Sequence, residues 1–313
     1  MNWQAFPQSV VTALIMLVGL LMLASVASIA FVKLRPEQDY RELRQRVRTW
    51  WSIVAVFTVA LLFNRTVSVW VFGFVSFLAF KEYLSLIPTR RADHRVLFWA
   101  YLAIPAQYYW VWSGWYGMFI IFIPVYMLLL LPMRMVLIGE TQGFLRAVGT
   151  LHWGLMITVF GLSHMAYLLD LPVAINPAGG VAGLLIYLVF LTEINDVSQY
   201  VWGKSFGKRK IIPKISPGKT VAGFIGGVLT TVLLAVVIAP YLTPLSLYEA
   251  LGAGVIIGVA GFIGDVTISA LKRDLGVKDS GSILPGHGGI LDRLDSLTYT
   301  APLFFHYVYY LHY

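Results

Sequence analysis

The sequence contains no cysteine and few charged residues. Only 12% of its 313 residues are Asp, Glu, Lys or Arg, 58% are hydrophobic, and the mean hydropathy is +0.76. The absence of cysteine excludes disulfides, thiolate nucleophiles and zinc–thiolate or iron–sulfur sites. The shortage of charge excludes a water-soluble globular, disordered or fibrous protein, because too few polar residues remain to cover a surface. The N-terminal stretch lacks a basic segment, so we expect no cleaved signal peptide.

Long apolar runs are abundant instead. A helix crosses the hydrocarbon core of a membrane with about 20 apolar residues, because its backbone groups must be paired internally there. The sequence therefore predicts an all-α polytopic membrane protein with about ten transmembrane helices and no soluble domain. The expected spans lie near residues 9–32, 48–63, 67–86, 95–112, 114–132, 146–168, 179–202, 220–240, 246–272 and 294–312.

The basic residues are confined to alternate loops between these spans. The chain has 23 Lys and Arg against 15 Asp and Glu, and every basic residue except Arg65 falls on one side. The positive-inside rule makes that side cytoplasmic and places both termini outside. We expect an integral protein of the inner or plasma membrane of a bacterium. The positive charge is explained by this topology, so we expect no nucleic-acid partner.

Polar residues divide the chain into two parts. Residues 1–178 form about six spans with few ionisable groups, and the Lys81-Glu82 pair at a cytoplasmic helix end is interpreted as packing and snorkelling. We expect this part to be a scaffold and to take part in dimer formation. Residues 179–313, with cytoplasmic loops 203–219 and 273–293, are predicted to form the catalytic transmembrane domain, because charges inside apolar helices are costly and usually functional. The charges in question are Glu193, Asp196, Asp265, Asp292 and Asp295.

Helical spacing predicts a metal site in this second part. Asp265, Ser269 and Lys272 are spaced to share one face of the ninth helix, and Asp292 and Asp295 share a face of the tenth. Antiparallel packing of these helices would bring the three carboxylates together. Carboxylate oxygens without softer ligands suit Mg²⁺. Basic residues beside such an ion are what phosphate chemistry requires.

Two long motifs in this part resemble a known family. The sequence reads Ser269-x-x-Lys272-Arg273-x(4)-Lys278-Asp279-x(5)-Pro285-Gly-His287-Gly-Gly-x-x-Asp292-Arg293-x-Asp295, and earlier Phe206-Gly-Lys and Ser216-Pro-x-Lys219-Thr220-x-x-Gly223-x-x-Gly226-Gly227. Both are similar to the signature of phosphatidate cytidylyltransferases, the CDP-diacylglycerol synthases. The resemblance covers roughly residues 180–313.

The resemblance implies an activity and its residues. The family joins CTP to phosphatidic acid in phospholipid biosynthesis, releasing CDP-diacylglycerol and pyrophosphate, with Mg²⁺ and often K⁺ assisting, and its members form homodimers through membrane helices. A phosphatidate oxygen would attack the α-phosphorus of CTP in line. Metal binding is implied for Asp265, Asp292 and Asp295, with Lys272 and Arg273 completing the catalytic set. Substrate binding is implied for Ser216, Pro217, Lys219, Lys278, Asp279, His287, Arg293 and Asp196.

Two departures from the family pattern keep alternatives open. This chain has Asp196-Val-Ser-Gln-Tyr200 where the family usually has Asp-x-Gly-Ala-Tyr, and Val221-Ala222 where Trp-Glu or Trp-Gln tends to stand. A divergent paralogue that acts on another lipid phosphate, or acts weakly, is one alternative. An ion-coupled membrane transporter is another, since intramembrane carboxylates also serve transport, although the long cytoplasmic loops argue against it.

Overall fold

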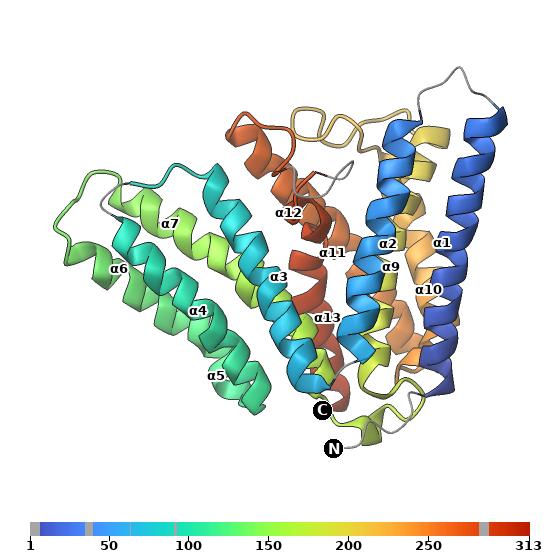
Figure 1. Cartoon of the computed structure of the whole chain (residues 1–313), viewed down its shortest axis with the longest axis horizontal. Coiled ribbons are helices and arrows are strands. Elements are labelled where there is room, and N and C mark those ends of the chain that lie inside the picture. Colours follow the sequence, from blue (N-terminus) through green and yellow to red (C-terminus); the bar gives the residue numbers. More distant parts are fainter. Residues whose placement is uncertain (1–6, 35–39, 63, 91–92, 282–287) are drawn as a thin grey trace.

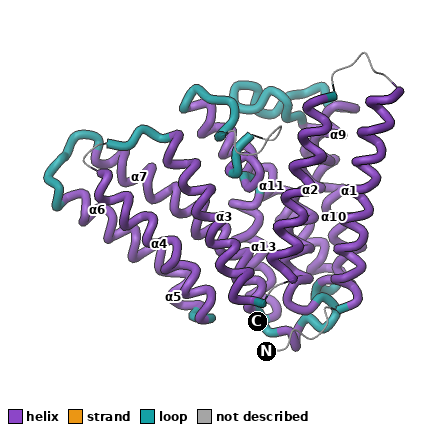
Figure 2. Tube along the Cα trace, viewed as in Figure 1, coloured by secondary structure: helices purple, strands orange, loops and turns teal. Residues whose placement is uncertain are grey.

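The computed structural model of the chain describes residues 7–34, 40–62, 64–90, 93–281 and 288–313. Helices dominate these residues, and none of them belongs to a strand (Figure 2). The main helices are α1 (Gln8–Leu34), α2 (Arg41–Leu62), α3 (Arg65–Leu86), α4 (His94–Ser113), α5 (Tyr116–Ile121), α6 (Leu128–Val136), α7 (Phe144–Leu155), α8 (Gly161–Tyr167), α9 (Gly180–Phe206), α10 (Val221–Leu242), α11 (Leu247–Asp274), α12 (Leu291–Leu294) and α13 (Leu297–His312). Two π-helical turns, Phe122–Met127 and Met156–Phe160, join α5 to α6 and α7 to α8. Short 3₁₀ turns lie at Leu168–Asp170 and Val173–Ile175.

Seven helical segments of the described part are long and apolar enough to cross a membrane. They are Gln8–Ala30, Arg65–Leu86, Tyr116–Val136, Phe144–Asp170, Gly180–Phe206, Val221–Leu242 and Leu247–Asp274. The three remaining expected spans, near 48–63, 95–112 and 294–312, fall on α2, α4 and α13. The prediction of an all-α polytopic membrane protein is therefore confirmed.

Local sequence sets the starts of the helices that carry the site. Thr220 precedes α10, and its hydroxyl accepts a hydrogen bond from the Gly223 N–H at 3.1 Å. Ser246 and Glu249 form a capping box at the start of α11, with the Glu249 carboxylate accepting from the Ser246 N–H at 2.7 Å. Such caps satisfy backbone donors that have no partner within the helix.

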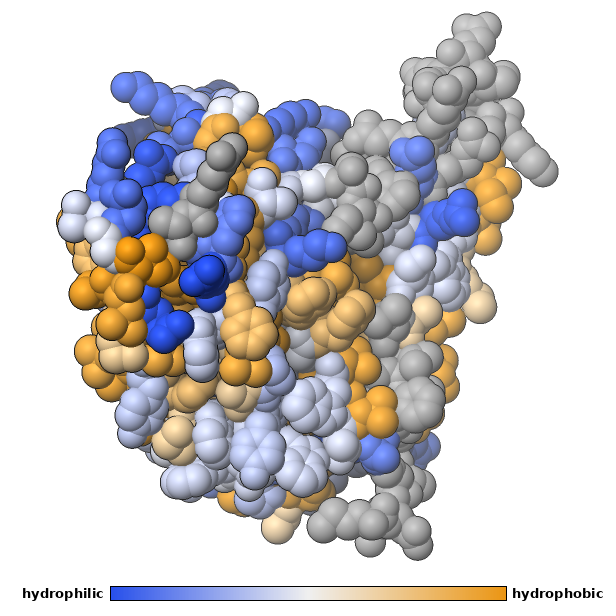
Figure 3. Space-filling view, turned by 60° about the vertical axis from the view of Figure 1, so that its left-hand side comes forward, coloured by the Kyte–Doolittle hydropathy of each residue, from blue (hydrophilic) through white to orange (hydrophobic). Residues whose placement is uncertain are grey.

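The loops that follow α3, α6, α9 and α11 lie at the same end of the bundle (Figure 1). We call this end the basic face, because the predicted basic loops meet there. Helix α1 begins and α13 ends at the opposite end. Arg65 lies at that opposite end, where it forms an ion pair with Asp170 at 2.5 Å. The visible surface has its most hydrophilic residues towards the basic face, with a hydrophobic band below (Figure 3). The predicted alternation of loops is thus confirmed, while their cytoplasmic orientation stays a prediction.

Helices α9, α10, α11 and α13 pack closely around the site because glycines stand at their contacts. A Cβ on Gly264 of α11 would lie 2.5 Å from the Asp295 carbonyl oxygen, and one on Gly254 would lie 2.7 Å from the Val232 Cα of α10. Small residues allow this approach between membrane helices. The N-terminal part joins the same body, since α3 contacts α12 and α8 contacts α13.

Candidate functional site

Asp292 is a buried carboxylate, and both of its oxygens accept hydrogen bonds from described residues of the protein. The Lys272 ammonium of α11 donates to its Oδ1 at 2.6 Å, and the amides of Ser280 and Gly289 donate to its Oδ2 at 2.8 and 3.0 Å. Burial alone would raise the pKa of Asp292, but the Lys272 ammonium and the two amides hold this pKa below its ordinary value. Asp292 is therefore an anion fixed in place at the start of α12.

Asp265 forms a second group further along α11. Lys219, at the end of the loop before α10, lies with its Nζ 2.5 Å from Asp265 Oδ2 and donates to Gln199 Oε1 at 3.0 Å. The Ser269 hydroxyl donates to Asp265 Oδ1 at 3.3 Å. The expectation that Asp265 and Ser269 share a helix face is confirmed. Lys219 therefore connects the loop before α10 to Asp265 of α11.

Asp196 of α9 and Asp295, between α12 and α13, face this second group. Ser296 ties them together, since its hydroxyl donates to Asp196 Oδ2 and its amide donates to Asp295 Oδ1, both at 2.8 Å. The charges of Asp196 and Asp265 act on Asp295, as does the Arg293 guanidinium. Asp196 Oδ1 is buried and has no hydrogen-bond partner in the described part of the chain. We call Asp196, Asp265 and Asp295 the carboxylate cluster.

The structure differs from the predicted metal site in one respect. It brings Asp295 towards Asp265, as expected, but it places Asp292 in a separate group with Lys272. Both Asp292 oxygens already accept strong hydrogen bonds, so Asp292 is poorly suited to bind a cation. Among the described residues, no three His, Asp or Glu side chains are arranged as a ready metal site. Asp196 Oδ1, which is buried without a partner in the described part of the chain, is a hard donor of the kind that divalent cations prefer.

The other predicted site residues surround these groups at the basic face. Arg273 is exposed, and its guanidinium donates to the carbonyls of Ile215 and Val277, both at 3.3 Å, which connects the loop before α10 with the end of α11. The Ser216 carbonyl accepts from the Lys219 amide at 3.2 Å. The other exposed members of the set are Pro217, Lys278 and Asp279. The predicted His287 lies outside the described residues.

Glu82 is the residue that the sequence interpretation missed. We expected Lys81 and Glu82 to form an ordinary helix end, but Glu82 is only 5% exposed. Its carboxylate accepts hydrogen bonds from the Ser280 hydroxyl and from the amides of Ile290 and Leu291, at 2.9 and 3.0 Å for the amides. The sequence shows Glu82 only as an acidic residue beside an apolar span. Nothing in that pattern indicates that its partner, Ser280, lies 198 residues further along the chain.

Two hollows open near the basic face. One, of about 560 Å³, lies between α9 and α10. It is lined by apolar side chains such as Ile225 and Leu229 and by the cations Lys208 and Arg209. Val221 and Ala222, at one of the two departures from the family pattern, also line it. We call this hollow the α9–α10 groove.

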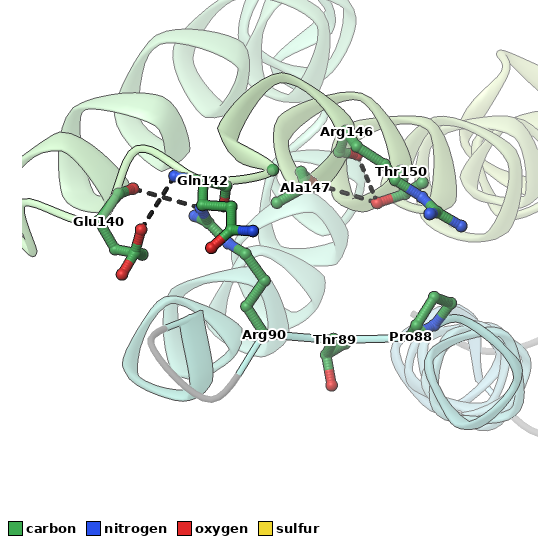
Figure 4. A pocket seen from close by; sticks show the side chains of 9 residues that line it. Pro88, Thr89, Arg90, Glu140, Gln142, Arg146, Ala147 and Thr150 are labelled. Atoms are coloured by element: carbon green, nitrogen blue, oxygen red, sulfur yellow. Dashed lines mark hydrogen bonds between the residues drawn. The ribbon is translucent and has the colours of Figure 1, made fainter.

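The other hollow, of about 500 Å³, lies between the end of α3 and the start of α7 (Figure 4). Arg90 spans it and donates to the carbonyls of Glu140 and Gln142 at 3.2 and 2.6 Å. Arg90 is also paired with Asp93, so its charge is already used within the protein. This hollow contains none of the predicted site residues.

Fold and site together define a class of protein. It is a polytopic helical membrane protein that gathers carboxylates, lysines and arginines at one end of its bundle, where a charged group can meet the membrane boundary. Comparison with known sequences agrees with this class. The chain matches the cytidylyltransferase family over residues 44–311 and belongs to that family.

Individual relatives fall into two kinds. An uncharacterised protein of Escherichia coli, YnbB, is 46% identical over 294 residues, which cover 94% of this chain and 96% of that protein. Phosphatidate cytidylyltransferases of Staphylococcus haemolyticus and Haemophilus influenzae are 41% and 43% identical over 120 and 132 residues. These matches cover 38% and 41% of this chain and 46% of each relative. The likeness to phosphatidate cytidylyltransferases therefore spans less than half of those proteins.

Proposed function

We propose that this protein transfers a cytidylyl group from CTP to a lipid phosphate at its basic face, with phosphatidic acid as the first candidate acceptor. The products would be CDP-diacylglycerol and pyrophosphate. The observation that carries the proposal is the carboxylate cluster of Asp196, Asp265 and Asp295, which faces Lys219 and the charge of Arg293. Membership of the cytidylyltransferase family supports the choice of nucleotide.

The carboxylate cluster would hold Mg²⁺. Such an ion, when bound, neutralises phosphate charge and stabilises the pyrophosphate that leaves. Lys219 lies beside the cluster and can donate to phosphate oxygens when it is not paired with Asp265. A K⁺ ion and a homodimer are further expectations from the family resemblance and belong to the same proposal.

The transfer needs no general base. A phosphate oxygen of the lipid forms a bond to the α-phosphorus of CTP while the bond to the β-phosphate oxygen breaks, and pyrophosphate departs with the electron pair. A lipid phosphate is already largely ionised near neutral pH, so no proton has to be removed before the attack. The protein's task is to align the two substrates and to balance their negative charge.

The α9–α10 groove supports a lipid as acceptor. Its apolar wall of Ile225 and Leu229 lies beside Lys208 and Arg209 at the basic face. This order suits a phospholipid whose acyl chains stay in the bilayer while its phosphate meets the cations. We propose that the basic face is cytoplasmic, because CTP is supplied there and the positive-inside rule favours it.

A second candidate is transfer to a lipid phosphate other than phosphatidic acid. Both departures from the family pattern lie at the site proposed here, which supports this second candidate. Gln199 accepts a hydrogen bond from Lys219 beside the carboxylate cluster, and Val221 and Ala222 line the α9–α10 groove. Changes at these positions alter the surroundings of the substrate and leave the carboxylates unchanged.

The experiment is an assay of purified protein with labelled CTP, Mg²⁺ and separate lipid phosphates. We expect label in a CDP-lipid and release of pyrophosphate, and a loss of at least about a hundredfold in Asp265→Asn. Asp274→Asn is the matched control, because Asp274 is an exposed aspartate on the same helix. Transfer to another lipid only would support the second candidate. Solute transport by proteoliposomes without consumption of CTP, or full activity of Asp265→Asn, would contradict the proposal.

A further inference from the structure

We infer that Glu82 on α3 is a positioning residue for this site, so that the N-terminal part of the chain helps to set the geometry of the catalytic part. The inference rests on the proposed function. Glu82 Oε1 accepts from the Leu291 amide at 3.0 Å and from the Ser280 hydroxyl, while Oε2 accepts from the Ile290 amide at 2.9 Å. One side chain from α3 therefore contacts the segment that carries the family signature at two places, Ser280 and the Ile290–Leu291 pair.

The surroundings of Glu82 are shaped for a carboxylate. The residue is only 5% exposed, and its three donors are neutral groups. A Cβ on Gly289 would lie 1.9 Å from Glu82 Oε1, and one on Gly281 would lie 2.9 Å from Oε2. A buried anion is costly unless hydrogen bonds satisfy it, so this arrangement specifies a charged acceptor at this point.

Glu82 and Asp292 hold the same stretch of backbone from two sides. Ser280 donates its hydroxyl to Glu82 and its amide to Asp292. Likewise, the Gly289 amide donates to Asp292, and the next two amides donate to Glu82. Asp292 in turn accepts from Lys272 at 2.6 Å. A change at Glu82 therefore shifts Asp292, and with it Lys272, without touching any of the residues proposed to meet substrate.

The first test compares Glu82→Gln with Glu140→Gln. Glutamine has the same shape but turns an N–H₂ group towards backbone donors. We expect kcat of Glu82→Gln to fall by about ten- to a hundredfold while KM for CTP changes less than threefold, because misplaced groups lose alignment more than binding. Glu140 is an exposed glutamate between α6 and α7, and its variant should keep wild-type kinetics. Unchanged kcat in Glu82→Gln would overturn the inference.

The second test does not depend on activity. Hydrogen–deuterium exchange is measured in detergent for Glu82→Gln and for Glu82→Ala, with intact folding checked by thermal unfolding. If Glu82 positions Asp292, exchange quickens at least tenfold at the amides of Ser280 and Gly289, which bind Asp292 and not Glu82. Faster exchange confined to Ile290 and Leu291 would show that Glu82 affects only the amides that bind it directly, and this result would overturn the inference. An inactive wild-type protein with the wider exchange pattern would refute the proposed function and leave the positioning role standing.

Discussion

The carboxylates at the basic face fall into two groups that are built in opposite ways. Asp292 and Glu82 are buried, and hydrogen bonds from the protein reach both oxygens of each. In the carboxylate cluster, the charges of Asp196 and Asp265 act on Asp295, and Asp196 keeps a buried oxygen without a partner in the described part of the chain. Lys219 pairs with one member of that cluster only.

This difference separates two tasks. Groups whose hydrogen bonds are complete fix a geometry, because moving them leaves a desolvated donor or acceptor unpaired. Groups that repel one another and keep free oxygens have capacity for a cation or a substrate. On this basis we propose that Asp292 and Glu82 hold the geometry of the site and that the carboxylate cluster binds the cation.

The largest expected difference between the two groups is in stability, and it is tested by neutralising one carboxylate from each group. We expect Asp292→Asn to lower the free energy of unfolding by about 3–5 kcal/mol, because Lys272 would stay buried without its anion. Asp265→Asn should cost less than about 1 kcal/mol. Asp265 and Lys219 are 22% and 17% exposed, and the substitution also removes the repulsion between Asp265 and the carboxylates of Asp196 and Asp295. Denaturant or thermal unfolding in detergent measures both.

A double variant is the control for this prediction. Adding Lys272→Met to Asp292→Asn removes the unpaired cation, so part of the lost stability should return. Equal losses in the two single variants, or no recovery in the double variant, would show that the two groups do not differ as described.

A smaller effect is expected from crowding the Glu82 pocket. The Cβ of Gly289→Ala would meet Glu82 Oε1 and the Ser280 hydroxyl, so the variant should lose about 1–3 kcal/mol of stability along with activity. Gly149→Ala is the matched control, because Gly149 lies in α7 with nothing within 4 Å of its added Cβ. Alanine there should leave stability unchanged or raise it slightly. Tolerance of alanine at Gly289 would argue against a pocket shaped around Glu82.

The smallest expected effect is a dependence on pH. The pKa of Asp292 is lowered in the folded protein, so its stabilising effect is complete above the ordinary aspartate pKa and is lost as pH falls through the lowered value. The stability gap between wild type and Asp292→Asn should therefore narrow below about pH 4, by at most about 1.4 kcal/mol per pH unit for one proton. Parallel unfolding curves of the two proteins over this range measure the gap. A constant gap would mean that Asp292 is not held as an anion.

Much of the fold could be predicted, because the signals for it are local. Each expected span falls on a helix, and Arg65 lies apart from the other basic residues as the loop pattern required. The pairing of Asp265 with Ser269 followed from helical spacing. The sequence did not predict that Asp292 and Asp265 lie in separate groups. Spacing within a helix does not show that Asp292 pairs with Lys272 while Asp265 pairs with Lys219.

The sequence by itself determined a helical membrane protein with all but one of its basic residues on one side and a signature typical of cytidylyltransferases. Hydropathy, helical period and loop charge settle these features along the chain, without contacts between distant segments. Only the tertiary structure decided that Glu82 joins the site. Its bond to Ile290 spans 208 residues, and whether a carboxylate at a helix end meets water or backbone amides depends on which helices pack beside it. The packing of α3 against α12 settled that question for Glu82.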